Sequence, residues 1–102
     1  MRGVKVKRVK RGCTYNVNGK VIHQNYSYVI ALLYWFKKPR YLRLRNGWWE
    51  KLNNDEPCDV ELTSDINHAT SFRDETMNYM NKETAELLAK KIKDEPDKFI
   101  LY

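Results

Sequence analysis

The side chains best suited to chemistry are two cysteines and two histidines, which recur at the same spacing in each half of the chain. Cys13 precedes His23 by ten residues, and Cys58 precedes His68 by ten residues. Together they supply the ligand types of a Cys2His2 zinc site, but structural zinc sites usually take ligand pairs with only about two to four residues between them. The spacing therefore disfavours a metal site, and we expect neither a metal nor a cofactor.

The same histidines, set beside lysines and tyrosines, have the residue types of a general acid and base for RNA cleavage. No motif supports that chemistry, because His23 is expected on a strand and His68 on a surface turn, where polar side chains are ordinary. Two of the four glycines follow asparagine in expected turns, so no phosphate-cradling loop is predicted. We therefore expect a protein without enzymatic activity.

Arginines interleaved with aromatic residues stand out between residues 40 and 52. Asn46-Gly47 separates two runs of alternating apolar and charged residues, which is the strongest short-range signal for a β-hairpin. The register of that hairpin predicts four candidate binding residues on or beside its outer face: Tyr41, Arg43, Arg45 and Trp48. Bases of single strands stack on aromatic rings while nearby cations neutralise phosphates, so this face suits nucleic acid.

The same face has a purely structural interpretation. A cation–π contact between Arg45 and Trp48 and an ion pair between Arg43 and Glu50 would stabilise the hairpin without any ligand. Tryptophan, tyrosine and arginine are also enriched at protein–protein hot spots. A protein partner therefore suits the face as well as a nucleic acid does.

Charge is distributed unevenly along the chain. The net charge of +6 combines 13 Lys/Arg and one acidic residue in residues 1–51 with 6 Lys/Arg and 12 acidic residues in residues 52–102. Either the acidic half packs beside the basic half and neutralises it, or the basic half meets a polyanion. Asp59 and Glu61 are expected to pair in part with the outer arginines of the hairpin. The exposed basic patch is then smaller than the hairpin face.

Residues 3–11 alternate valine with lysine or arginine and then slip phase between Val6 and Val9. This pattern predicts either an edge strand with a bulge or a basic arm that lies on phosphates. Four cations of this segment join the candidate binding residues: Lys7, Arg8, Lys10 and Arg11.

The N-terminal segment lacks the apolar core and small-residue cleavage site of a secretory signal. The longest apolar run, at 26–36, is also far shorter than the roughly 20 residues of a membrane span. We expect a cytoplasmic protein that does not associate with membranes, in which Cys13 and Cys58 are reduced thiols.

Turn and cap signals predict the elements that position these residues. A second Asn-Gly pair, Asn18-Gly19, predicts a hairpin in which Val17 pairs with Lys20 and Tyr15 with Ile22.

Residues 28–38 favour a helix that Ser27 caps and Pro39 stops, with a buried strand as the competing interpretation. As a helix the segment would be apolar nearly all round. A homodimer through Tyr28 to Phe36 is therefore a candidate assembly.

The C-terminal half adds four elements. They are a strand at 59–63, a helical turn at 65–69 capped by Thr63 or Ser64, a helix at 82–93 capped by Asn81, and a strand at 98–102. The prediction is a single α+β domain over residues 1–102. It has an antiparallel sheet built on the two Asn-Gly hairpins, with the helices at 28–38 and 82–93 packed on one face.

Residues 59–102 also resemble small uncharacterised accessory proteins of bacteriophages that infect low-GC Gram-positive hosts. The resemblance rests on the strand, the run Thr63 to Phe72, and a helix containing Glu83, Ala85 and Ala89. It implies a mobile-element accessory protein in the host cytoplasm and assigns no site residues.

The resemblance, the small size and the lack of catalytic motifs predict a non-enzymatic, phage-type protein that binds and inhibits or modulates a host macromolecule. A defence nuclease or nucleoprotein complex fits, as for anti-CRISPR or anti-restriction inhibitors. The alternative is a single-stranded nucleic-acid or RNA-binding protein that uses the same basic aromatic face.

Overall fold

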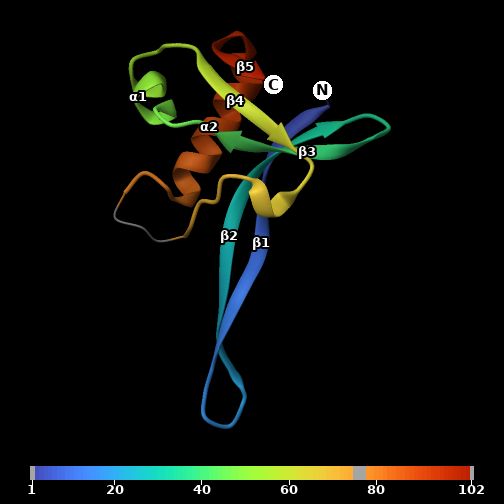
Figure 1. The fold of residues 1–102 in the computed structure, drawn as a ribbon, viewed down its shortest axis with the longest axis vertical. Helices are drawn as coiled ribbons and strands as arrows, with labels where there is room; N and C mark the ends of the chain where they lie inside the picture. The colour runs from blue at the N-terminus through green and yellow to red at the C-terminus, as the bar shows by residue number, and fades with distance from the viewer. Residues whose placement is uncertain (1, 75–77, 102) are drawn as a thin grey trace.

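The computed structural model describes residues 2–74 and 78–101, which form a small α+β domain built on a five-stranded sheet (Figure 1). The strands lie in the sheet in chain order: β1 (Gly3–Tyr15), β2 (Val21–Tyr34), β3 (Lys37–Leu44), β4 (Cys58–Thr63) and β5 (Phe99–Leu101). The helical elements are α1 (Trp48–Asn53), α2 (Lys82–Asp94) and two 3-10 turns, η1 (Ile66–His68) and η2 (Pro96–Lys98). The predicted α+β class is confirmed.

The sheet is mixed, so the prediction of a purely antiparallel sheet is wrong. β1 to β4 pair antiparallel, whereas β5 pairs parallel to β4. The chain between residues 64 and 98 crosses over through α2, and such a crossover returns the chain in the original direction. Within the described residues, no helix has the length and apolar character needed to cross a membrane.

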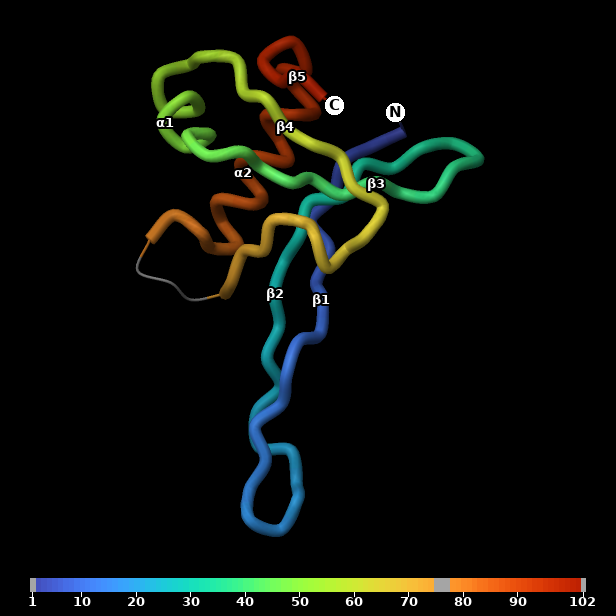
Figure 2. Tube along the Cα trace, viewed as in Figure 1, coloured from blue at the N-terminus to red at the C-terminus, as the bar shows by residue number. Residues whose placement is uncertain are grey.

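β1 and β2 form a long hairpin whose outer end projects from the rest of the molecule (Figures 1 and 2). At its inner end Val4 and Val6 pair with Leu32 and Ile30 and pack in the core on which α2 lies. Residues 8–26, which we call the arm, continue the same ribbon outward. The projection matches the longest dimension of the molecule, 52 Å against 36 and 20 Å for the others.

The segment expected as a helix at 28–38 is the inner half of β2, so the competing interpretation, a buried strand, is correct. Ile30 and Leu32 point into the core beneath α2, while Val29 and Ala31 pack on the other face in a smaller core. Both faces of β2 are therefore covered, which explains its continuous apolar run. Tyr28 to Leu32 are buried within the chain, so the helical surface on which a homodimer was expected does not exist.

Asn18-Gly19 does lie in the loop of the β1–β2 hairpin, and Gly19 has a φ of +81°. The predicted register is wrong, because Tyr15 pairs with Val21 and not with Ile22. The side-chain oxygen of Asn16 accepts hydrogen bonds from the backbone N–H groups of Asn18 and Lys20, both at 2.9 Å. These bonds favour a loop wider than the two-residue turn that Asn-Gly alone predicts.

The predicted hairpin at 40–52 is wrong. Gly47, with a φ of +86°, precedes the helix α1, and Lys51 N–H donates to the Gly47 carbonyl at 3.2 Å. β3 instead pairs with β4, which sets Arg43 opposite Glu61. The helix carries Trp48 into the core, and burial of this large ring outweighs the local turn preference.

The arm leaves the sheet because residues 70–72, which we call the bridging segment, enter between β2 and β3. Tyr28 N–H donates to the Phe72 carbonyl at 2.7 Å, and Phe72 N–H donates to the Tyr28 carbonyl at 2.8 Å. On the other side, Thr70 N–H donates to the Leu42 carbonyl at 3.0 Å, and Leu44 N–H donates to Thr70 Oγ1 at 2.8 Å. The bridging segment thus satisfies backbone groups that β2 and β3 no longer share.

Several C-terminal elements lie where the sequence predicts them. These are β4, the turn η1, the helix α2 and β5, although Tyr102 of the predicted strand lies outside the described residues. Asn81 caps α2 as predicted, since its side-chain oxygen accepts from Thr84 N–H at 2.9 Å. The cap of η1 is Asp65, and not Thr63 or Ser64.

Candidate functional site

The predicted aromatic binding face does not form, because its two aromatic residues are inside the protein. Tyr41 and Trp48 are each only 8% exposed. The Trp48 ring lies edge-on to Phe72, with centroids 6.2 Å apart, and Tyr79 stacks on Trp49 at 4.4 Å. Burial of the Tyr41 and Trp48 rings leaves neither of them open to a nucleobase.

The arginines of that face are exposed but partly neutralised. Glu61 on the neighbouring strand lies 3.8 Å from Arg43 Nε and 3.3 Å from Arg45 Nε. The predicted pairing of Arg43 with Glu50 is wrong, because Glu50 is in α1 and Glu61 stands opposite on β4. The expectation that Glu61 forms ion pairs with these arginines is confirmed. Asp59 instead pairs with Lys51 at 3.8 Å. A binding role for Arg43 and Arg45 stays a prediction.

The cations predicted at 7–11 lie on β1, which is an edge strand of the sheet. Lys7 Nζ stands 6.0 Å from the centre of the Tyr41 ring on one face of the hairpin. On the other face the Arg8 guanidinium lies 4.3 Å from the centre of the Tyr26 ring. The strand interpretation of this segment is therefore correct, and its register shift lies after Lys10, not between Val6 and Val9.

The arm has an entirely basic set of charges. Residues 8–26 contain Arg8, Lys10, Arg11 and Lys20, and no acidic residue precedes Glu50. Within the described residues, no carboxylate lies within the 4.0 Å limit of an ion pair to any of these cations. A projecting ribbon without acids concentrates positive potential along its length.

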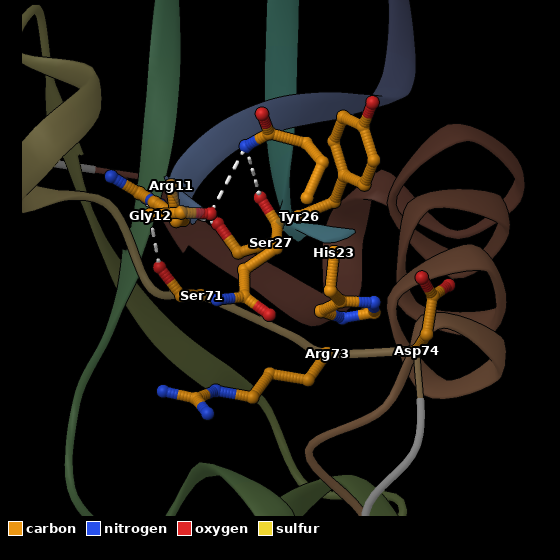
Figure 3. Close-up of a pocket in the computed structure, with 10 residues that line it drawn as sticks. Arg11, Gly12, His23, Tyr26, Ser27, Ser71, Arg73 and Asp74 are labelled. Carbon is orange, nitrogen blue, oxygen red and sulfur yellow. Dashed lines mark hydrogen bonds between the residues drawn. The ribbon is translucent and has the colours of Figure 1, made fainter. Parts of the chain in front are cut away.

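A cleft of about 620 Å³ opens where the arm meets the bridging segment (Figure 3). It is lined by Arg11, Gly12, His23, Gln24, Asn25, Tyr26, Ser27, Ser71, Arg73 and Asp74. Arg11 is held in place by hydrogen bonds to Ser27 Oγ at 2.6 Å, Asn67 Oδ1 at 3.2 Å and Ser71 Oγ at 3.2 Å. All three partners are neutral, so the arginine keeps its full charge at the base of the arm.

Among the residues that the structure describes, Asp74 is the one acidic residue that lines this cleft. Its carboxylate accepts a hydrogen bond from the Tyr28 hydroxyl, which raises the pKa of Tyr28 above its ordinary value. Figure 3 shows the Arg73 side chain extending away from Asp74. Among the described lining residues, the two arginines Arg11 and Arg73 outnumber the single carboxylate, an arrangement suited to an anion.

The two thiols and two histidines do not come together. Cys13 on the arm donates to Gln24 Oε1 at 2.9 Å, whereas Cys58 is buried below α1 and has its pKa raised, chiefly by desolvation. His68 on η1 lies 3.7 Å from the Asp65 carboxylate. Within residues 2–74 and 78–101, no group of three or more His, Cys, Asp or Glu side chains is placed to hold a metal ion.

Among the described residues, the most exposed aromatic side chains are Trp35 and Phe36, which the sequence prediction missed because it placed them inside a helix. They form the turn between β2 and β3, next to Lys37 and Lys38. No feature of the sequence marks where a strand in this segment would end, because the apolar run continues without a break from Tyr28 through Phe36.

Comparisons with protein-family models, with curated proteins and with solved structures found no match to this chain. Function is therefore inferred from its own geometry. The arm, the cleft at its base and the exposed turn all combine cations with groups that can contact an anionic polymer.

Proposed function

We propose that this protein is a non-enzymatic nucleic-acid-binding protein that lays its β1–β2 arm along the phosphate backbone. One observation carries the proposal: the arm is a projecting two-stranded ribbon with cations and no acidic residue. The major groove of duplex DNA is wide enough to admit such a ribbon. Contacts of lysine and arginine with phosphates supply most of the affinity in sequence-independent binding.

The placement of the cations supports contact with phosphates on two sides. Arg8 and Lys10 pair across the ribbon with Tyr28 and Tyr26, so they share one face of the hairpin. Arg11 projects to the other face, where it bonds Asn67 and Ser71 beside η1. A ribbon that carries cations on both faces can neutralise both walls of a groove.

The test measures the affinity of the purified protein for a labelled duplex of about 20 base pairs at about 50 and 200 mM salt. We expect the Lys10→Glu/Lys20→Glu variant to lose more than about tenfold in affinity, with a salt slope lower by about 2. Lys90→Glu/Lys93→Glu, on the exposed side of α2, changes the net charge equally and should bind almost as wild type does.

Two outcomes contradict the proposal: no binding by the wild-type protein at low salt, or equal losses in the arm and α2 variants. Arg43→Glu/Arg45→Glu is measured in parallel. If only that variant loses affinity for the duplex, the binding surface is the face of Arg43 and Arg45 predicted from the sequence.

The second candidate is the phage-type inhibitor of a host defence nuclease or nucleoprotein complex. It is favoured by the tip of the arm, where four apolar residues are exposed: Tyr15, Val17, Val21 and Ile22. Phosphate contacts do not need such residues, whereas the buried centre of a protein–protein interface is more apolar than the rest of the surface.

This candidate predicts capture of a protein from a nuclease-treated lysate of a Gram-positive host. Val17→Asp/Ile22→Asp should abolish the capture while the nucleic-acid affinity stays unchanged. The captured enzyme should then lose activity when wild-type protein is added. Capture that survives in this variant, or a captured enzyme that stays fully active, would rule out inhibition through the tip.

A further inference from the structure

The turn between β2 and β3 places large aromatic residues where the backbone favours glycine. Tyr34 pairs with Lys37, which leaves Trp35 and Phe36 as a two-residue connection. Phe36 has a φ of +60°, in the left-handed region that glycine and asparagine occupy easily and bulky residues rarely adopt. Bulky residues held in this region cluster at functional sites, so the turn is a candidate contact.

The two rings are also the most exposed tryptophan and phenylalanine among the described residues. Phe36 is 105% exposed and Trp35 is 67% exposed. One face of the Trp35 ring is covered by the Arg2 guanidinium, 5.3 Å from the ring centre. Neither ring packs in either of the two hydrophobic cores, so burial does not account for a tryptophan and a phenylalanine at these positions.

Cations surround this turn. A shallow groove of about 600 Å³ beside it is lined by Tyr34, Lys37, Lys38, Pro39, Arg40, Leu62 and Ser64. Three of these seven residues are positively charged, and none is acidic. Among the described residues, none of the three has a carboxylate within the 4.0 Å limit of an ion pair. The groove is therefore complementary to a negatively charged ligand that also has flat apolar surfaces.

From this combination we infer that the Trp35–Phe36 turn binds unpaired bases of a single-stranded nucleic acid. The rings of Trp35 and Phe36 stack on successive bases, and Lys37, Lys38 and Arg40 contact the phosphates that link them. The inference rests on the proposed function in taking nucleic acid as the ligand. It adds a second site, separate from the arm, that distinguishes single strands from duplexes.

The two sites lie on different projections of the molecule. The arm extends along the longest dimension, whereas the β2–β3 turn points to the side of the body (Figure 1). Such an arrangement suits a junction at which a duplex continues into a single strand. The protein should therefore bind a duplex with a single-stranded extension more tightly than either part alone.

The test uses three labelled probes: a single strand of about 15 thymidines, a duplex of about 20 base pairs, and that duplex with the single strand as an extension. Trp35→Ala/Phe36→Gly is the turn variant, and its glycine relieves the backbone at Phe36, so the fold is retained. We expect this variant to lose at least about tenfold for the single strand, with duplex affinity unchanged. Lys10→Glu/Lys20→Glu should show the opposite pattern.

The outcomes separate the two proposals. If the turn variant binds the single strand as wild type does, the inference is wrong, whatever the arm variant shows. If the turn variant alone loses affinity and the arm variant binds the duplex normally, the inference holds and the proposed role of the arm is wrong.

Vesicles of phosphatidylcholine and phosphatidylglycerol provide the remaining comparison, because an anionic bilayer also suits aromatic and basic residues. Sedimentation of the wild-type protein with these vesicles, lost in the turn variant while single-strand affinity is kept, would overturn the inference.

Discussion

Different contacts hold the two strands of the β1–β2 hairpin together at its inner and outer ends. At the inner end, Val6 and Ile30 pair beneath α2, and the strands are fixed by burial on the body of the protein. The arm is tied to η1 and the bridging segment at its base, where Arg11 bonds Asn67 and Ser71, and beyond that point it projects past α1 and α2 (Figure 1). It is held by cross-strand contacts such as Arg8 on Tyr26 at 4.3 Å and Cys13 to Gln24 at 2.9 Å.

An isolated two-stranded hairpin is at best marginally stable in water. The arm therefore takes its order from its root, where the bridging segment fixes Tyr28. Side chains at the inner end, such as Val6 and Ile30, stabilise the fold by packing in its core, whereas most side chains of the arm are exposed to solvent. The exposed basic and apolar side chains of the arm are therefore the ones on which the proposed contact with another molecule depends.

The largest effect should come from removing the buried aromatic ring of the bridging segment at this root. Phe72→Ala removes a fully buried ring that contacts Trp48 and should lower the free energy of unfolding by about 3–5 kcal/mol. Val17→Ala, at the exposed tip of the arm, should change it by less than about 0.5 kcal/mol. Urea denaturation of the two variants measures this difference, and comparable losses would show that the tip belongs to the core.

The two glycines with left-handed backbones should respond differently although their strain is alike. Alanine at either position should cost about 1–2 kcal/mol locally, since φ is +86° at Gly47 and +81° at Gly19. Gly47→Ala acts at the start of α1 and should lower the global stability by that amount. Gly19→Ala should instead increase hydrogen exchange in the arm with a smaller global loss. Equal global losses would mean that the arm unfolds only together with the body.

A smaller change in the free energy of unfolding is expected when the ion pairs of Glu61 with the arginines of the neighbouring segment are removed. Glu61→Gln removes contacts of 3.3 and 3.8 Å with Arg45 and Arg43, all partly exposed. The loss of unfolding free energy should be about 0.2–1 kcal/mol and should shrink as salt is added. Glu56→Gln, in the exposed loop after α1, serves as the control in the same thermal melts. A salt-independent loss would point to packing and not to charge.

The smallest effect concerns the buried thiol and appears only in alkaline solution. Because desolvation raises the pKa of Cys58, the folded state holds this proton more tightly than the unfolded state does. The free energy of unfolding should therefore fall as pH rises through and above about 8.5, the ordinary value for a thiol. Cys58→Ala should reduce this slope and Cys13→Ala should retain it, in urea melts between about pH 8 and 9.5. Identical slopes in both variants would contradict the assignment.

Features that a few neighbouring residues determine could be predicted from the sequence. Asn81 caps α2 through its own side chain, and Gly19 and Gly47 take the positive φ that an Asn-Gly pair suggests. The alternation in residues 59–63 likewise identified β4, whose polar face presents Glu61 to the arginines of β3. Each of these signals acts over a few residues.

Features that depend on distant residues could not be predicted. Asn46-Gly47 is compatible with a hairpin or with the start of a helix, and burial of Trp48 beside Phe72 decides between them. Residues 28–34 suit a helix locally, and they form a strand because cores lie on both faces of β2. Tertiary packing overrides local preference in both places.

In the candidate site, too, features set by neighbouring residues could be predicted and features set by distant residues could not. Lys7, Arg8, Lys10 and Arg11 could be identified as an exposed basic segment, since their alternation with valine predicts a strand with a charged face. The exposure of Trp35 and Phe36 could not be predicted, because it depends on where β2 ends. The helix prediction placed those rings inside an element, and the Asn46-Gly47 pattern separately directed the expected aromatic contact to Trp48.

The order of the strands has a consequence for how the protein folds. β1 to β4 are neighbours both in the sheet and along the chain, so their pairing requires only short loops to close. The pairing of β4 with β5 requires closure of the whole segment from residue 64 to residue 98, and contacts so far apart in sequence form slowly. We therefore expect β1 to β4 to assemble early, with the C-terminal strand joining last and setting the observed folding rate.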